Sequence, residues 1–241
     1  MFEHDLVSGF ANAIKTHTPL PEITQTFDLT AAYALQHQVT ALISTQGVGG
    51  VKLGVTNPQA QAFFGIDHAL LGGLYGDGRL GSGAAIQQLE GRGLETEFAV
   101  LVDGDGQPMA IAPAIEIVFV SFSRKSDMTA PNLVVGNLGA DLFLVGDFLP
   151  WDSLHSDVTA TLSRNGEVVN EASMNEALGG PTAALPWVWE EMKIRGYPRQ
   201  EDTLIMMGAC GGVVPAEIGN YQADYGPMGT LQFTIESSVA V

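Results

Sequence analysis

Three glutamates in two apolar segments are the residues of this sequence best suited to bind a metal ion. Residues 93–102 and 113–120 are rich in β-branched and other apolar side chains, which is typical of strands. Because strand side chains alternate between faces, Glu95 and Glu97 must point to the same side. Glu116 lies within the second apolar segment, where an unpaired carboxylate is costly to bury. Converging carboxylates without histidine or thiolate neighbours suit a hard cation such as Mg²⁺, Mn²⁺ or Ca²⁺.

Both this cluster and a nearby lysine also have simpler interpretations. A Glu-x-Glu pair on a strand is often just the solvated face of an antiparallel sheet. Lys52 stands between Val51 and Leu53 in a short apolar segment that reads as a strand. It is either an ordinary exposed lysine, a lysine that reaches the edge of the sheet, or the partner of a buried acid.

Composition limits the classes of partner. The chain has 241 residues, 46% of them apolar, and a formal net charge of −17 with only ten Lys and Arg. This charge argues against nucleic acids and anionic membranes as partners. A bound divalent cation would supply the positive charge that an anionic ligand needs. With a single cysteine, Cys210, no signal-peptide pattern and no long apolar run, we expect a cytoplasmic protein.

The elements that must position the glutamates are mostly strands. Helical spacing of apolar residues predicts a helix over residues 2–16 and another from Asp28 or Thr30 to about Ser44. Asn165-Gly166 predicts a two-residue hairpin. We therefore expect a helical region at residues 1–46 packed on a β-rich catalytic domain at residues 47–241, and the clearest helix of the chain starts near Pro181 and ends at Gly196.

Two glycine-rich segments are candidates for ligand loops. Residues 65–83 are dense in glycine, which predicts a long loop and favours a mobile lid. Within it, residues 76–81 match G-x-G-x-x-G, but neither a preceding strand nor a following helix supports nucleotide binding. Residues 103–106 read Asp-Gly-Asp-Gly, and turn chemistry explains them better than a calcium loop.

A series of short motifs, taken together, resembles one known family. The motifs are Lys52-Leu53-Gly54-Val55-Thr56, Glu95-Thr96-Glu97, Pro113-Ala114-Ile115-Glu116-Ile117, Gly136-Asn137, Arg164-Asn165-Gly166-Glu167, Leu178-Gly179-Gly180-Pro181 and Gly208-Ala209-Cys210. In this order they resemble the fumarylacetoacetate hydrolase superfamily, and more closely its branch of 2-keto-4-pentenoate hydratases and 4-oxalocrotonate decarboxylases.

The resemblance implies a fold, a cofactor and a reaction. The fold would be of the α+β class, with a mostly antiparallel coiled β-sheet core, an N-terminal helical region and one long C-terminal helix, usually in a homo-oligomer. The three glutamates would hold Mg²⁺ or Mn²⁺, which would bind a small anionic keto acid. The reaction would be hydration of a short 2-hydroxydienoic acid. A decarboxylase, a C–C hydrolase of the same superfamily and a non-catalytic homologue that binds metal and keto acid are the alternatives.

The resemblance also assigns further site residues. It implies a catalytic role for Lys52 and places Leu70, Asn137 and Gly208 against the substrate. The chain departs from the family pattern at several of these positions. Leu70 stands where hydratases carry an acid in Q-P-D-F-G, and Gly180 replaces the histidine of G-H-P. These departures suggest a changed substrate or a weakened activity.

Overall fold

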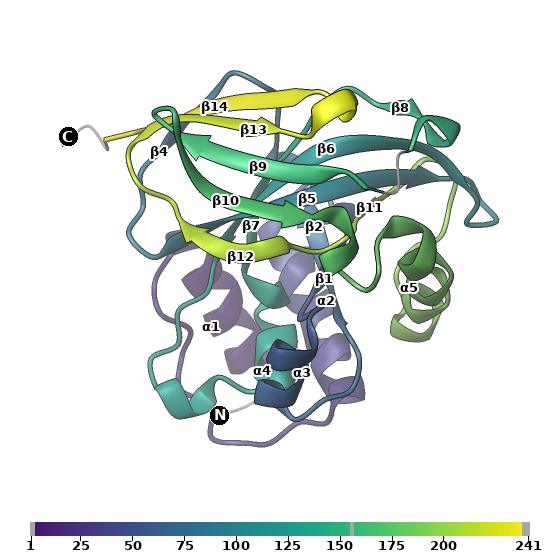
Figure 1. Cartoon of the computed structure of the whole chain (residues 1–241). Coiled ribbons are helices and arrows are strands. Elements are labelled where there is room, and N and C mark those ends of the chain that lie inside the picture. The colour runs from purple at the N-terminus through teal and green to yellow at the C-terminus, as the bar shows by residue number, and fades with distance from the viewer. Residues whose placement is uncertain (1–2, 155–156, 238–241) are drawn as a thin grey trace.

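Two curved sheets form the upper part of the molecule, and helices lie below them and to one side (Figure 1). The computed structural model describes residues 3–154 and 157–237. The helices are α1 (Glu3–Thr16), α2 (Leu29–Ile43), α3 (Pro58–Phe64), α4 (Ala130–Val135) and α5 (Pro181–Arg195). Within the described part of the chain, no helix has the length and apolar character needed to cross a membrane.

The larger sheet carries the glutamate strands. Along its main path the strands run β2-β1-β11-β5-β6-β7-β3, with β12 paired to β5 and β8 paired to β6. Its strands are β1 (Val48–Gly54), β2 (Leu70–Tyr75), β3 (Arg79–Leu80), β5 (Arg92–Val102), β6 (Pro108–Phe119), β7 (Ala140–Val145), β8 (Leu149–Pro150), β11 (Thr203–Met206) and β12 (Cys210–Pro215). The sheet curls so far that β2 contacts β7, which lies five strands away along that path.

The smaller sheet covers the larger one. Its strands follow the order β10-β9-β13-β14-β4. They are β4 (Ala84–Gln87), β9 (Thr159–Arg164), β10 (Glu167–Ser173), β13 (Gly219–Asp224) and β14 (Thr230–Glu236). Both sheets are mixed, because β1 pairs in parallel with β11, β3 with β7 and β4 with β14. The fold is thus a mixed α/β arrangement with a curled sheet, and the expectation of a mostly antiparallel core is not confirmed.

Several local predictions are confirmed. The first helix is described from residue 3, because residue 2 of the predicted span lies outside the described range. The second helix, α2, starts directly after the cap residue Asp28, whose side chain accepts a hydrogen bond from the Ala31 amide. The hairpin turns at Asn165-Gly166 between β9 and β10. The helix α5 ends at Gly196, which takes the left-handed conformation with φ of 79°.

The predicted loop at residues 65–83 is wrong, because it contains the buried strand β2. The run Leu70–Tyr75 is buried along its whole length and pairs with β1. Its glycines provide space and do not mark a loop. A Cβ on Gly72 would lie 2.9 Å from Cε of Lys52 and 3.2 Å from the carbonyl oxygen of Asn137. Glycine is therefore required at this position because the lysine side chain crosses it.

Candidate functional site

The three glutamates converge on one face of β5 and β6. The two strands are antiparallel neighbours, and Glu95 stands directly opposite Glu116. Glu97, two residues along, projects to the same side. The three side chains offer ligand oxygens that all lie within 4.8 Å of one another. The other face of β5 is apolar, and Phe98 is buried there, so packing fixes the direction in which the acids point.

Burial excludes the interpretation of this pair as a solvated sheet face. Glu97 and Glu116 are completely buried and Glu95 is half-buried. Burial raises the pKa of all three carboxyl groups, and the neighbouring carboxylates raise those of Glu97 and Glu116 further. The pKa of Glu116 reaches about 7. Such shifts show that the site disfavours three negative charges unless a positive partner is present.

Lys52 supplies part of that positive charge. Its side chain is only 2% exposed, so it is not an exposed strand lysine. The Nζ atom lies 3.1 Å from Oε1 of Glu116 and donates a hydrogen bond of 2.9 Å to the carbonyl oxygen of Leu138. Burial lowers the pKa of this ammonium group, but Glu116, Glu95 and Glu97 together raise it above its ordinary value. Lys52 is therefore the charged partner of a buried acid.

One lysine leaves the carboxylates incompletely satisfied. Oε2 of Glu97 accepts a hydrogen bond of 2.8 Å from the amide of Gly208. Within the described residues, Oε1 of Glu97 and both carboxylate oxygens of Glu116 make no well-aligned hydrogen bond. Buried oxygens without donors are costly, and they are the ligands that hard divalent cations prefer. The donor set fits Mg²⁺ or Mn²⁺, and its ligands would be Glu95, Glu97 and Glu116.

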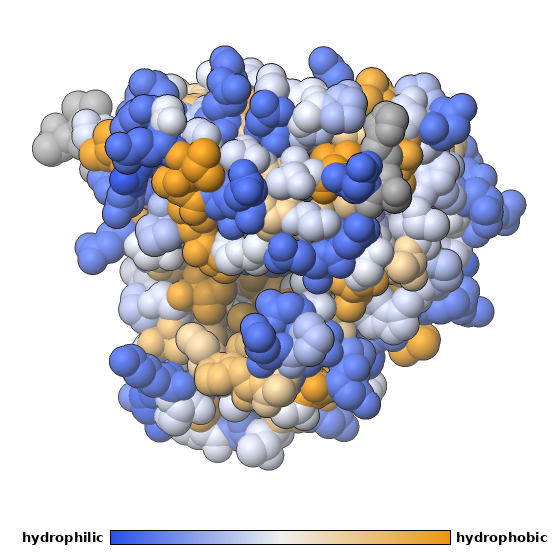
Figure 2. Space-filling view, in the orientation of Figure 1, coloured by the Kyte–Doolittle hydropathy of each residue, from blue (hydrophilic) through white to orange (hydrophobic). Residues whose placement is uncertain are grey.

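A cavity of about 630 Å³ opens above this cluster. Lys52 and Glu95 line its inner end. Its remaining walls are largely apolar, and Figure 2 shows a hollow with apolar residues at its edge between the upper sheets and the helices below. The volume lies within the range of roughly 300–1,000 Å³ that is usual for small-molecule sites. The cluster therefore has a ligand-sized space beside it.

Two of the predicted substrate contacts lie outside the cavity wall. Leu70 is fully buried in the apolar core at the start of β2. The side chain of Asn137 accepts from the Gly73 amide at 2.7 Å and donates to the Gly73 carbonyl at 2.7 Å, so it joins the loop before β7 to β2. Neither lines the cavity. Both residues hold the curled sheet together, and the structure gives them no ligand-facing atom.

The third predicted contact acts through a glutamate. Gly208 donates its amide to Glu97 and does not line the cavity itself, although the following residue, Ala209, does. Its φ of +94° and the 2.5 Å distance from a built Cβ to Cγ2 of Thr56 exclude other residues at this position. Cys210 is buried, and burial raises the pKa of its thiol, so it is a packed thiol and not a reactive one.

Arg92 is a cavity residue that sequence reasoning missed. Its Nε donates to Asp141 at 2.7 Å and Nη1 donates to the Gln87 carbonyl at 2.9 Å. Nε2 of His17 lies 3.0 Å from the other carboxylate oxygen of Asp141. Burial opposes ionisation of Asp141, but His17 and Arg92 hold the pKa of that carboxyl below its usual value. No spacing pattern indicates this network, because its members come from three distant segments.

The alternation of side chains along a strand could have indicated part of the apolar wall of the cavity. Val118 and Val120 follow Glu116 at intervals of two residues and line the same cavity. The α3 and α4 residues Phe64 and Leu133 line the cavity as well. No local pattern predicted them, because neither short helix was expected. Each has a side-chain cap with proline in the first two helical positions: Asn57 with Pro58 for α3, and Thr129 with Pro131 for α4.

Comparison with known proteins places this arrangement in a family. No family model matches the chain. A 2-keto-4-pentenoate hydratase from Burkholderia vietnamiensis is 30% identical over 244 aligned residues, which cover 91% of this chain and 91% of that protein.

Solved structures share the fold. Two structures of 4-oxalocrotonate decarboxylase from Pseudomonas putida, one complexed with calcium and acetate and one with magnesium and adipate, match with TM-scores of 0.87 and 0.86. They are 19% and 18% identical, and each match covers 97% of both chains. Fumarylpyruvate hydrolase from Pseudomonas aeruginosa, in complex with Mn²⁺ and pyruvate, matches with a TM-score of 0.59 at 11% identity, over 81% of this chain and 93% of that one. The chain belongs to the 2-keto-4-pentenoate hydratase family.

Proposed function

We propose that this protein is a divalent-metal-dependent hydratase of a 2-hydroxydienoic acid or its 2-keto tautomer. The observation that carries the proposal is the converging trio Glu95, Glu97 and Glu116, of which Glu95 lines a ligand-sized cavity. The relative from Burkholderia vietnamiensis, whose name states this activity, supports the substrate class. The solved structures with magnesium or Mn²⁺ support the choice of a hard cation.

The protein's own residues fix the polar end of the substrate. Glu95, Glu97 and Glu116 would hold Mg²⁺ or Mn²⁺, and the bound ion supplies positive charge to the carboxylate and the 2-oxygen of the acid. Without a bound ion, the three glutamates raise the pKa of Lys52, which favours its ammonium form. Its ammonium group holds Glu116 in place and adds positive charge at the inner end of the cavity, where negative charge develops when the dienol becomes a ketone. We propose Lys52 as the catalytic residue of the chain for this reason.

The apolar walls determine where water meets the substrate. Phe64, Leu133 and Val120 exclude bulk water from the conjugated chain. The electron-accepting end lies at the glutamates, so water adds at the remote end of the conjugated system, which faces the opening of the cavity.

A second candidate is a non-catalytic protein that binds metal and keto acid. One observation favours it: among the described residues that line the cavity, the titratable side chains are only Lys52, Glu95 and Arg92. Arg92 is committed to Asp141, so the lining offers no obvious acid to protonate the substrate carbon. In this alternative the site binds the acid tightly without turning it over.

The decisive assay follows the ultraviolet absorbance of 2-hydroxypenta-2,4-dienoate. We expect loss of absorbance with Mg²⁺ or Mn²⁺, none with chelator, and a hydroxylated keto acid as product. Lys52→Met should lower kcat at least about 100-fold, as loss of a charge-stabilising group does. Lys193→Met, on the exposed side of α5, is the matched control and should behave as wild type. Release of CO₂ would identify a decarboxylase, and binding without turnover would identify the second candidate.

A further inference from the structure

The walls of the cavity beyond the glutamates are largely apolar, and their apolar side chains come from four separate regions of the chain. β6 contributes Val118, the segment just after that strand contributes Val120, and α3 contributes Phe64. α4 contributes Leu133, and β12 contributes Val213. A five-carbon acid is smaller than the ligands for which a cavity of about 630 Å³ is usual. If such an acid were bound at the glutamates, much of this apolar wall would face water, which is unfavourable.

The same walls offer no unpaired Lys or Arg side chain to a second carboxylate among the described residues. Among the described residues that line the cavity, Lys52 and Arg92 are the only Lys or Arg. Lys52 is paired with Glu116 at the inner end. The guanidinium of Arg92 is held by Asp141 and by the Gln87 carbonyl, with Nε2 of His17 3.4 Å from Nη2. A carboxylate at the remote end of a ligand would lose its hydration without gaining a free cation.

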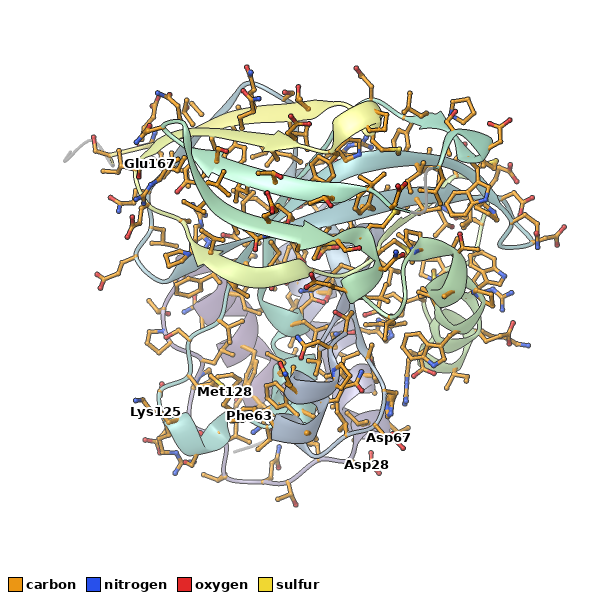
Figure 3. The ribbon with its side chains drawn as sticks, viewed as in Figure 1. Asp28, Phe63, Asp67, Lys125, Met128 and Glu167 are labelled. Atoms are coloured by element: carbon orange, nitrogen blue, oxygen red, sulfur yellow. The ribbon has the colours of Figure 1, made fainter. Side chains whose placement is uncertain are left out.

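The opening of the cavity is also apolar. Met128 and Val213 line it and are 39% and 57% exposed, respectively. Phe63, whose ring lies edge-on to that of Phe64 at 5.0 Å, is 72% exposed. Figure 3 places Met128 and Phe63 on the helical part of the molecule, and Figure 2 shows apolar surface around the hollow. Large apolar side chains that are exposed together often mark a contact surface, and Met128 and Val213 place part of this one on the cavity lining.

We propose that the substrate is a monocarboxylic 2-hydroxydienoic or 2-keto acid with a bulky apolar group, an alkyl chain or an aryl ring, at the end remote from the carboxylate. Its polar end lies at Glu95 and Lys52, and its apolar group lies between Phe64, Leu133 and Val213. Dicarboxylic acids are disfavoured. The placement of the substrate's polar end rests on the proposed function. The placement of its apolar group rests on the apolar walls alone.

Binding of saturated 2-keto acids tests the proposal without requiring turnover. Titration calorimetry with the Mn²⁺-loaded protein would compare 2-oxopentanoate, 2-oxohexanoate and 2-oxooctanoate with the dicarboxylic acid 2-oxoadipate. We expect roughly threefold tighter binding for each added methylene group, since apolar area is buried. We expect 2-oxoadipate to bind more weakly than 2-oxohexanoate. Equal affinity along the series, or tighter binding of the dicarboxylic acid, would overturn the proposal.

A charge at the cavity opening should change this preference. Met128→Lys is tolerated by the fold because the side chain is partly exposed. The variant should bind 2-oxooctanoate less tightly relative to 2-oxoadipate, and the ratio of the two affinities should fall by at least about tenfold. A tenfold change in affinity corresponds to the loss of about two buried methylene groups, or to an electrostatic change of the same size. Met128→Leu should keep the ratio. If Met128→Lys also keeps it, the remote end of the ligand does not lie at this opening and the proposed binding position is wrong.

Rates of hydration of substituted dienoates, compared with the binding data, test the proposed function and the substrate class separately. If dienoates are not hydrated but 2-oxooctanoate binds more tightly than 2-oxopentanoate, the hydratase assignment fails and the substrate class stands. If the unsubstituted dienoate is hydrated while pentyl and phenyl derivatives react more slowly, the hydratase assignment stands and the substrate class fails.

Discussion

Replacing Glu97 with glutamine should stabilise the metal-free protein while removing its response to metal. Glu97 is completely buried, and its Oε2 accepts the Gly208 amide. The amide oxygen of glutamine can keep that hydrogen bond, and its NH₂ group can donate to Glu95 or Glu116. Glu97→Gln therefore removes a buried negative charge with little change in shape.

The expected gain follows from the spacing of the charges. The ligand oxygens of the three carboxylates lie within 4.8 Å of one another. With an effective dielectric constant of about 20, two like charges at that distance repel by roughly 3 kcal/mol. Glu97 has two such neighbours and one opposing charge, on Lys52, so its net penalty is on the order of 3 kcal/mol. For a chain of this size, that gain raises Tm by roughly 6–12 °C.

Thermal denaturation at about pH 8, with chelator and with excess Mn²⁺, measures both effects. Wild type should show a low Tm with chelator and a marked rise with Mn²⁺, because binding to the native state stabilises it. Glu97→Gln should start higher and respond little. Glu167→Gln is the matched control, since Glu167 is an exposed carboxylate at the start of β10, at the far end of the sheet (Figure 3). A variant less stable than wild type with chelator, yet equally responsive to Mn²⁺, would refute the reasoning.

Three further predictions concern the same site and its support. Without metal, the pKa of Glu116 is raised from its ordinary value to about 7. Proton binding to Glu116 therefore favours the folded state; this contribution to the free energy of unfolding is complete below about pH 4.5 and is lost as the pH rises through 7. Tm in chelator should therefore fall between about pH 5 and pH 8, and saturating Mg²⁺ should remove most of this slope. Asn137→Ala leaves the Gly73 amide and carbonyl without partners and should destabilise the protein by roughly 2–4 kcal/mol in urea denaturation. Gly208→Ala should weaken Mn²⁺ binding at least about tenfold by calorimetry, because its Cβ would displace Thr56 and disturb the amide that orients Glu97.

The convergence of the three glutamates is predictable in part because a strand has a short, strict period. Two residues separate Glu95 from Glu97, so they share a face wherever the strand lies. Glu116 was conspicuous because it interrupts an apolar run. That Glu116 stands opposite Glu95 is a matter of strand register, which the tight turn between the two strands fixes and which the sequence alone left open.

The surroundings of the site were harder to predict because they depend on contacts between distant segments. The glycines of β2 predict a loop, which is wrong, because glycine occurs both where the backbone is flexible and where space is needed. In β2, Gly72 provides space beside Lys52. Asn137 was assigned to the substrate from a motif, but its φ of 52° and its two bonds to Gly73 arise only when the sheet curls. Leu70 is buried in the core, although the resemblance places an acid at its position.

The central claim is that Glu95, Glu97 and Glu116 together bind one divalent cation. Anomalous diffraction from crystals grown with Mn²⁺ tests it most directly. A single strong peak bounded by oxygens of all three side chains, beside Lys52 and open to the cavity, is the expected result. No peak at that position at saturating Mn²⁺, or a peak bound elsewhere on the acidic surface, would contradict the claim.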